Sequence, residues 1–160
     1  MIEVKNLHKS FGGTKVLKGV STIFESGKTN LIIGQSGSGK TVLLKCLLGL
    51  FNYEKGSISY DEKLFLSLSD NEKRTLRSQI GMVFQGGALF DSLTIAENVM
   101  FPLRMFTKQS RSEMEDRVNS ALKRVNLYDA HDKMPSEASG GMQKRVAIAR
   151  AIVNNPRYLF

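Results

Sequence analysis

The sequence lacks the cysteines of a disulfide-bonded protein and the long apolar run of a membrane-spanning protein. Its single cysteine, Cys46, excludes a disulfide within the chain, and its apolar neighbours predict a buried thiol in a reducing compartment. The longest apolar stretch, Val42 to Phe51, is broken by Lys45 and is about half the length that crosses a bilayer. The opening MIEVKNLHKSF lacks the apolar core of a signal peptide. We therefore expect a cytoplasmic protein.

The composition is that of an ordinary globular domain with an excess of positive charge. The 160 residues include 41% hydrophobic and 24% charged residues, enough for one domain with a core. The net charge of +8 requires a nucleic-acid partner to be considered. However, residues 1–80 carry 12 Lys/Arg against 7 Asp/Glu, and residues 81–160 carry 11 against 8. Such a dispersed excess fits a solvated face or attraction to anionic lipids equally well.

Apolar strand patterns alternate with helical ones, which predicts an α/β domain with a parallel sheet. Strands are expected near residues 2–7 and 16–24, with turns at FGG and SGK. NLIIG (residues 30–34) reads as a short buried strand, and IGMVFQ (residues 80–85) reads as another. KTVLLKCLLGL, from Lys40, is apolar nearly all round, so a helix buried in the core is expected.

Residues 92–136 read as a helical insertion. Thr94 with Glu97, and Ser110 with Glu113, have the spacing of capping boxes at the starts of two helices. The second box is followed by apolar residues at helical spacing, which predict an amphipathic helix: Met114, Val118, Leu122 and Val125. A further amphipathic helix, beyond residue 136, is predicted by Met142, Val146, Ala149 and Val153.

A glycine-rich loop follows NLIIG and matches the phosphate-binding pattern G-x-x-x-x-G-K-[ST] at every fixed position. Its residues are Gly34, Gln35, Ser36, Gly37, Ser38, Gly39, Lys40 and Thr41. The glycines let successive N–H groups turn toward a phosphate, and the following helix adds its positive dipole end. Lys40 would neutralise the outer phosphates, and the Thr41 hydroxyl would ligate Mg²⁺. The strand before and helix after disfavour a plain glycine-rich turn, but the loop does not distinguish a kinase, a GTPase, a helicase or a transport ATPase.

A second candidate anion site lies in SEASGGMQKR (residues 136–145). Ser139 would cap a helix whose first turn is opened by Gly140 and Gly141, leaving a hydroxyl, bare amides and a helix dipole together. Taken alone, this fragment is better read as a simple N-cap with flexible glycines.

Together, the phosphate loop, a strand ending in Gln85 and Ser-Gly-Gly opening a helix resemble the ATP-binding cassette of ABC transporters over essentially the whole chain. The resemblance implies a P-loop NTPase with a parallel-sheet core, an N-terminal antiparallel β subdomain and a helical insertion. It also implies ATP and Mg²⁺ as ligands and ATP hydrolysis by the complete protein. The implied division is residues 1–91 for the ATP-binding core and β subdomain, 92–140 for the helical subdomain, and 141–160 for the signature helix and the start of the Walker B strand.

The resemblance assigns roles to individual residues. Phe11 would stack on adenine with Val16 nearby, although both also fit plain strand core. Gln85 would reach Mg²⁺ and the attacking water. Ser139, Gly140 and Gly141 match the signature motif, which closes on the γ-phosphate of ATP held by a second copy in a head-to-tail homodimer. Two departures, Ala138 for leucine and Met142 for glutamine, leave the anion site intact but affect closure of the dimer.

The form Ser-Gly-Gly-Met and the stretch from Met82 to Arg104 look most like the ATPases of Mce/Mla-type phospholipid transport systems. After Gln85, the apolar residues Ala88, Leu89, Phe90 and Leu93 fit either satellite core or a groove for a partner helix. In this family the region from Gln85 to Leu93 receives the coupling helix of a membrane permease. We therefore expect a location at the cytoplasmic face of the membrane.

The closing NNPRYLF resembles the beginning of the family strand whose end carries an Asp that holds Mg²⁺. In the family a catalytic Glu follows that Asp, and a histidine on a later strand contacts the γ-phosphate. None of these is present, and neither His8 nor His131 matches. We expect part of a longer ATPase that binds nucleotide, hydrolyses it poorly and covers its open sheet by self-association. Two alternatives stay open: a soluble cassette ATPase acting on nucleic acid or ribosomes, and a non-hydrolysing, nucleotide-dependent dimerisation module. No nucleic-acid partner is expected.

Overall fold

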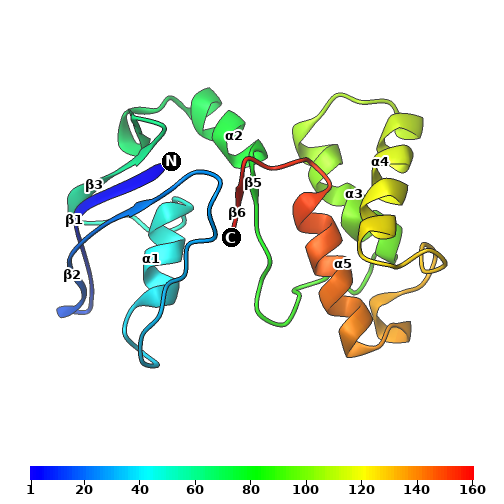
Figure 1. The fold of residues 1–160 in the computed structure, drawn as a ribbon, viewed down its shortest axis with the longest axis horizontal. Helices are drawn as coiled ribbons and strands as arrows, with labels where there is room; N and C mark the ends of the chain where they lie inside the picture. Colours follow the sequence, from blue (N-terminus) through cyan, green and yellow to red (C-terminus); the bar gives the residue numbers. More distant parts are fainter. The chain divides into compact units, whose positions relative to one another are not determined.

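The computed structural model describes residues 1–160 and forms two compact units, Met1–Lys73 and Arg74–Phe160 (Figure 1). The boundary between them falls inside a helix, α2 (Asp70–Ser78), rather than in a linker. The expected division into residues 1–91, 92–140 and 141–160 describes roles rather than packing, and it stays a prediction.

The first unit is built on a four-stranded antiparallel sheet in the order β2-β1-β3-β4. The strands are β1 (Ile2–Phe11), β2 (Thr14–Phe24), β3 (Lys55–Tyr60) and β4 (Lys63–Leu64). A hairpin turn at residues 12–13 joins β1 to β2, with Phe11 paired to Thr14. The buried residues Ile2, Val4 and Leu7 lie on β1. This sheet confirms the expected antiparallel β subdomain.

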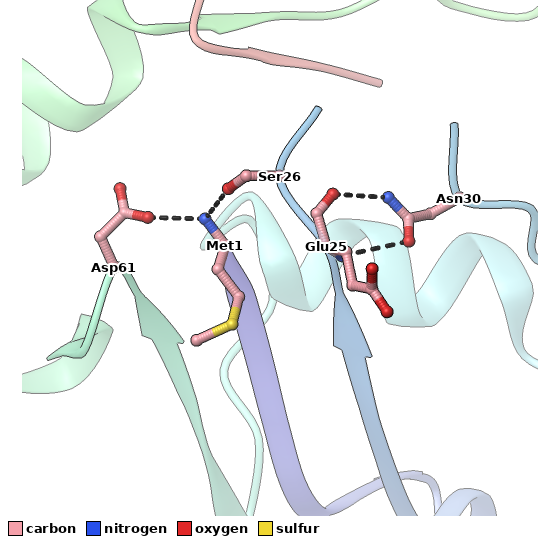
Figure 2. A network of polar contacts seen from close by, with 5 residues as sticks. All are labelled: Met1, Glu25, Ser26, Asn30 and Asp61. Carbon is pink, nitrogen blue, oxygen red and sulfur yellow. Dashed lines mark hydrogen bonds and ion pairs between the residues drawn. The ribbon is translucent and has the colours of Figure 1, made fainter. Parts of the chain in front are cut away.

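Hydrogen bonds connect the start of β1 with the segments that follow β2 and β3 (Figure 2). The ammonium group of Met1 donates to Asp61 Oδ1 and to Ser26 Oγ, both at 2.6 Å, joining the start of β1 to the segments that follow β3 and β2. The Asn30 side chain accepts from the Glu25 N–H and donates to the Glu25 carbonyl, both at 3.1 Å. It thereby closes the turn that leads from β2 toward the glycine-rich loop (Figure 2).

Helix α1 (Lys40–Leu47) packs beside β2 and buries one face only, through Leu43, Cys46 and Leu47. The expectation of burial all round is therefore too strong, because Leu50 beyond its C-terminus is 58% exposed. Cys46 is fully buried as predicted, and burial raises the pKa of its thiol. A 3-10 turn (η1, Phe65–Ser67) follows β4.

The prediction of a buried strand at NLIIG is wrong. Residues 30–34 lie outside every strand, and the side chains of Leu31 and Ile33 are 82% and 81% exposed. A strand requires hydrogen bonds to a neighbouring strand, and no segment of the chain provides them to residues 31–33. Apolar composition indicates that a segment is suited to burial, but it does not supply the partner.

The second unit contains a short parallel pair, β5 (Ile80–Gly81) and β6 (Tyr158–Leu159). The pair confirms parallel pairing and a strand within NNPRYLF. β5 is shorter than the expected residues 80–85, although the Val83 N–H still donates to the Phe160 carbonyl at 2.8 Å. Glycine is required at position 81, because a Cβ there would lie 2.2 Å from the carbonyl oxygen of Ala151.

Three helices form the core of the second unit: α3 (Ile95–Phe106), α4 (Arg111–Arg124) and α5 (Gly140–Ile152), with a 3-10 turn η2 (Pro135–Glu137) before α5. Both expected capping boxes are present, at Thr94/Glu97 and Ser110/Glu113. The predicted apolar stripes of α4 and α5 meet α3 in one buried cluster. No helix of the chain is long and apolar enough to span a membrane.

Candidate functional site

The glycine-rich loop is exposed from Gly34 to Ser38 and runs into α1. Gly37 and Gly39 have φ values of 79° and 95°, in the left-handed region that favours glycine. Lys40 folds back over the loop, where its Nζ donates to the carbonyls of Gly34 at 2.7 Å and Gln35 at 2.8 Å. No side chain caps α1 at Gly39, so the amides of its first turn remain able to bind an anion.

Phe11 and Val16, the expected adenine contacts, lie in the same unit as the loop. Val16 is beside the loop, because a Cβ on Gly39 would lie 3.1 Å from Val16 Cγ1. Phe11 ends β1 with 42% of its surface exposed, which does not fit plain strand core. An aromatic ring with this exposure is available for stacking, and its contact with adenine stays a prediction.

Ser139 caps α5, as its Oγ accepts from the Met142 N–H at 3.3 Å. Gly140 and Gly141 are exposed, and a Cβ added at Gly140 would meet nothing within 4 Å. The two departures from the family pattern have a packing explanation, because Ala138 is buried in the helical core and Met142 packs partly against it. The signature segment thus has both the cap and the open amides.

Gln85 is exposed in a turn that closes from the Phe84 carbonyl to the Gly87 N–H at 3.0 Å. The buried Arg150 of α5 fixes the following residues, donating to the carbonyls of Gly87 at 2.7 Å and Ala88 at 2.8 Å. Burial lowers the pKa of its guanidinium, which nevertheless stays charged at neutral pH.

Asn98 of α3 holds the same loop from the other helix. It is fully buried, accepts from the Phe90 N–H at 2.8 Å and donates to the carbonyls of Phe90, Leu93 and Thr94, each at 3.0 Å. Neither Asn98 nor Arg150 was expected from the sequence. The sequence pattern that could have identified them is a polar residue on the apolar face of a helix, because such a residue is buried and needs hydrogen-bond partners.

Beside this loop the second unit has a cavity of about 390 Å³ with a largely apolar lining. Phe90 and Phe101 meet at its wall with ring centroids 4.7 Å apart. Of the apolar loop residues, Leu89 packs against the core, whereas Ala88 and Phe90 line the cavity. Leu89 therefore fits satellite core, and the use of this surface as a groove for a partner helix stays a prediction. The other lining residues are Ser78, Ile80, Gly81, Met82, Phe84, Pro102, Met105, Phe106, Arg150, Ala151 and Asn154.

A metal ion here would depend on ligands other than protein carboxylates. The chain has no group of three or more His, Cys, Asp or Glu side chains that could hold a metal. The Thr41 hydroxyl and the Gln85 amide are exposed oxygen donors suited to Mg²⁺, with phosphate and water completing its shell. Thr41 belongs to the first unit and Gln85 to the second, so their joint geometry stays a prediction.

A sequence profile of the ABC transporter family matches residues 17–160. This chain belongs to the ABC transporter family. Its ATP-binding relatives include the methionine import protein MetN of Clostridium tetani, 43% identical over 99% of this chain and 50% of that protein. The probable ribonucleotide transport protein mkl of Mycobacterium leprae is 42% identical over 99% of this chain and 46% of that protein. The chain thus spans about half the length of these ABC relatives.

Solved ABC structures confirm the fold class. A dimeric ATP-binding cassette in a post-hydrolysis state, bound to ADP and Pi, superimposes with a TM-score of 0.86 and 35% identity over 98% of this chain and 71% of that chain. A component of the cbiONQ ABC transporter complex of Clostridium perfringens gives a TM-score of 0.85 at 32% identity, over 99% of this chain and 63% of that chain. The antiparallel β subdomain, the parallel strand pair and the helices of this chain are therefore ABC cassette elements.

Proposed function

We propose that the chain is the ATP-binding part of an ABC transporter ATPase, with Mg-ATP held at residues 34–41. The observation that carries the proposal is the exposed loop itself, with uncapped α1 amides and the Lys40 ammonium at its rim. In the complete protein, nucleotide binding and hydrolysis would drive transport through a separate permease at the cytoplasmic face of the membrane.

Each site residue has a physical role in this proposal. Main-chain amides of the loop bind phosphate oxygens, Lys40 neutralises the outer phosphates, and Thr41 fixes Mg²⁺ beside them. The Gln85 amide orients the attacking water and reaches the metal. We assign no residue of this chain to water activation, so we expect the 160-residue chain to bind nucleotide and hydrolyse it slowly.

We propose that Ser139, Gly140 and Gly141 act on the ATP of a second copy in a head-to-tail dimer. The capping hydroxyl and the open first-turn amides of α5 form an anion site distinct from the phosphate loop. A similar cassette solved as a dimer bound to ADP and Pi supports this arrangement.

The cavity beside Phe90 and Phe101 is the proposed docking place of the permease coupling helix. Its apolar lining suits the apolar face of an amphipathic helix. Asn98 and Arg150 hold the conformation of the neighbouring loop through hydrogen bonds to its carbonyls. We propose a phospholipid as the transported molecule, because residues 82–104 resemble those of the Mce/Mla-type ATPases. The names of relatives refer to methionine, ribonucleotides and spermidine/putrescine, and they do not support lipid.

Titration calorimetry tests the nucleotide site. Lys40→Ala is expected to weaken Mg-ATP binding at least about tenfold, because it removes a charge-assisted contact. Thr41→Ala should weaken binding of Mg-ATP but not of ATP in EDTA, and Lys18→Ala, an exposed lysine on β2, should change neither. No heat with Mg-ATP, together with steep salt-dependent DNA binding, would instead support the nucleic-acid alternative.

A further inference from the structure

The ring of Phe51 supports the exposed ring of Phe11 within the first unit. Their centroids are 5.3 Å apart and their planes are inclined by 67°, an edge contact between aromatic rings. Phe11 ends β1, whereas Phe51 follows α1, so the pair joins two separate elements. An exposed phenylalanine without such a neighbour would sample several rotamers, and the contact restricts them.

Phe51 is itself held by the helix that presents the phosphate loop. Its N–H donates to the Lys45 carbonyl at 3.1 Å, at the C-terminal end of α1. The Lys45 ammonium lies 5.0 Å from the centroid of the Phe51 ring, and the Lys9 ammonium lies 4.8 Å from that of Phe11. The two rings are thereby fixed relative to α1, whose first residue is Lys40.

The loop that carries Phe51 is also tied to the backbone just before Phe11. The Glu54 carboxylate accepts from the Ser10 N–H at 2.9 Å and from Lys9 Nζ at 3.2 Å. These contacts, the backbone bond first, lower the pKa of Glu54. The ring of Phe11 and the backbone N–H of Ser10 are therefore both anchored to residues 51–54.

We infer that Phe51 is a positioning residue for the nucleotide base: it holds Phe11 in the orientation that stacks on adenine. The inference rests on the proposed ATP site and on the adenine contact expected of Phe11. The phosphate loop contacts only phosphates, so preference for a nucleotide over a bare triphosphate has to come from contacts elsewhere, and an aromatic ring fixed in advance provides one at low entropic cost.

The test compares binding of Mg-ATP and inorganic Mg-triphosphate by the 160-residue chain. Phe51→Ala is expected to weaken Mg-ATP binding about 3- to 10-fold and to change Mg-triphosphate binding less than about twofold. Phe11→Ala should have the same two effects as Phe51→Ala. Phe51→Tyr, which keeps an aromatic ring, should keep the ATP preference of the unsubstituted chain. Leu50→Ala, at an exposed neighbouring position, should leave both affinities unchanged. Because the chain has no tryptophan, Phe51→Trp adds a single tryptophan, whose fluorescence, excited at a wavelength that the four tyrosines do not absorb, should respond to ATP and not to triphosphate.

The outcomes separate this inference from the proposed function. If the unsubstituted chain binds neither ligand, the phosphate site and the inference both fail. If it binds ATP no more tightly than triphosphate, the adenine contact fails and the inference with it. If the ATP preference is clear but survives Phe51→Ala, or if Phe51→Ala weakens both ligands equally, the positioning role alone is overturned. A loss with Phe51→Ala that Phe11→Ala does not reproduce also overturns it.

Discussion

At the scale of single residues, two polar side chains decide the shape of the loop after Gln85. Arg150 reaches this loop from α5 and Asn98 reaches it from α3, and both bond to its main chain. A loop lacks the regular internal hydrogen bonds of a helix or sheet, so its buried carbonyls need partners of this kind. The two residues thus fix the segment proposed to contact both magnesium and a permease.

Replacing Arg150 by lysine tests this arrangement. One ammonium group on a flexible stem cannot hold the carbonyls of Gly87 and Ala88 as the planar guanidinium does, so Arg150→Lys should lower the free energy of unfolding by about 1.5–3 kcal/mol. Urea unfolding followed by circular dichroism measures the change. Lys144→Ala, an exposed position on the same helix, should shift it by less than about 0.5 kcal/mol. Equal urea midpoints for Arg150→Lys and the unsubstituted chain would contradict the prediction.

The sequence predicts residues whose partners are close in the chain. The phosphate loop and the Ser139 cap follow from local spacing, because backbone amides and side chains a few residues apart form them. Arg150 and Gly87 are far apart in the sequence, and their contact exists only once α5 packs beside the loop. No local pattern encodes that contact.

At the scale of elements, helix starts were predicted best. The boxes at α3 and α4 were expected, and α2 was missed although it begins with the same signal, since Ser69 and Glu72 exchange hydrogen bonds. Strands were predicted less well, because residues 30–34 and 80–85 need neighbours that the segment itself does not specify.

The capping box of α4 predicts a pH effect. Hydrogen bonds from the Ser110 side chain and backbone lower the pKa of Glu113 below its ordinary value. A carboxyl group with a depressed folded-state pKa stabilises the fold above the ordinary glutamate pKa of about 4.3, and this stabilisation is lost as the pH falls through the folded-state value.

Glu113→Gln should therefore lose less stability than the unsubstituted chain on acidification through this range, while being no more stable at neutral pH. Thermal midpoints measured from neutral pH downward make the comparison. Asp116→Asn is the control, since Asp116 is exposed on the same helix outside the box. A parallel pH profile for Glu113→Gln and the unsubstituted chain would refute the effect.

At the scale of the whole molecule, the chain forms two compact units, and the amino-acid composition does not change at the boundary between them. Lys73 and Arg74 lie within α2, where there is neither glycine nor proline to signal a division. The helical insertion was predicted from its capping boxes and apolar spacing, whereas the antiparallel subdomain was implied by the resemblance to ABC cassettes, and the structure contains both.

The exposed residues Leu31 and Ile33 predict self-association of the 160-residue chain. Apolar side chains this exposed, on backbone without hydrogen bonds, favour contact with another copy. Replacing both by lysine should reduce the concentration-dependent increase in sedimentation coefficient without lowering the thermal midpoint. The matched control places lysine at two other exposed positions of this unit, Ile23 and Leu64. If both double variants reduce association equally, added charge rather than the 31–33 segment is responsible.

The fold-back of Lys40 onto Gly34 and Gln35 has a thermodynamic consequence. Its ammonium group is already solvated by two oxygens of its own chain before any ligand arrives. An incoming phosphate must therefore exchange with those oxygens, and the measured affinity contains only the difference between the two sets of contacts. These two contacts keep the Lys40 ammonium at the rim of the loop, in position for that exchange.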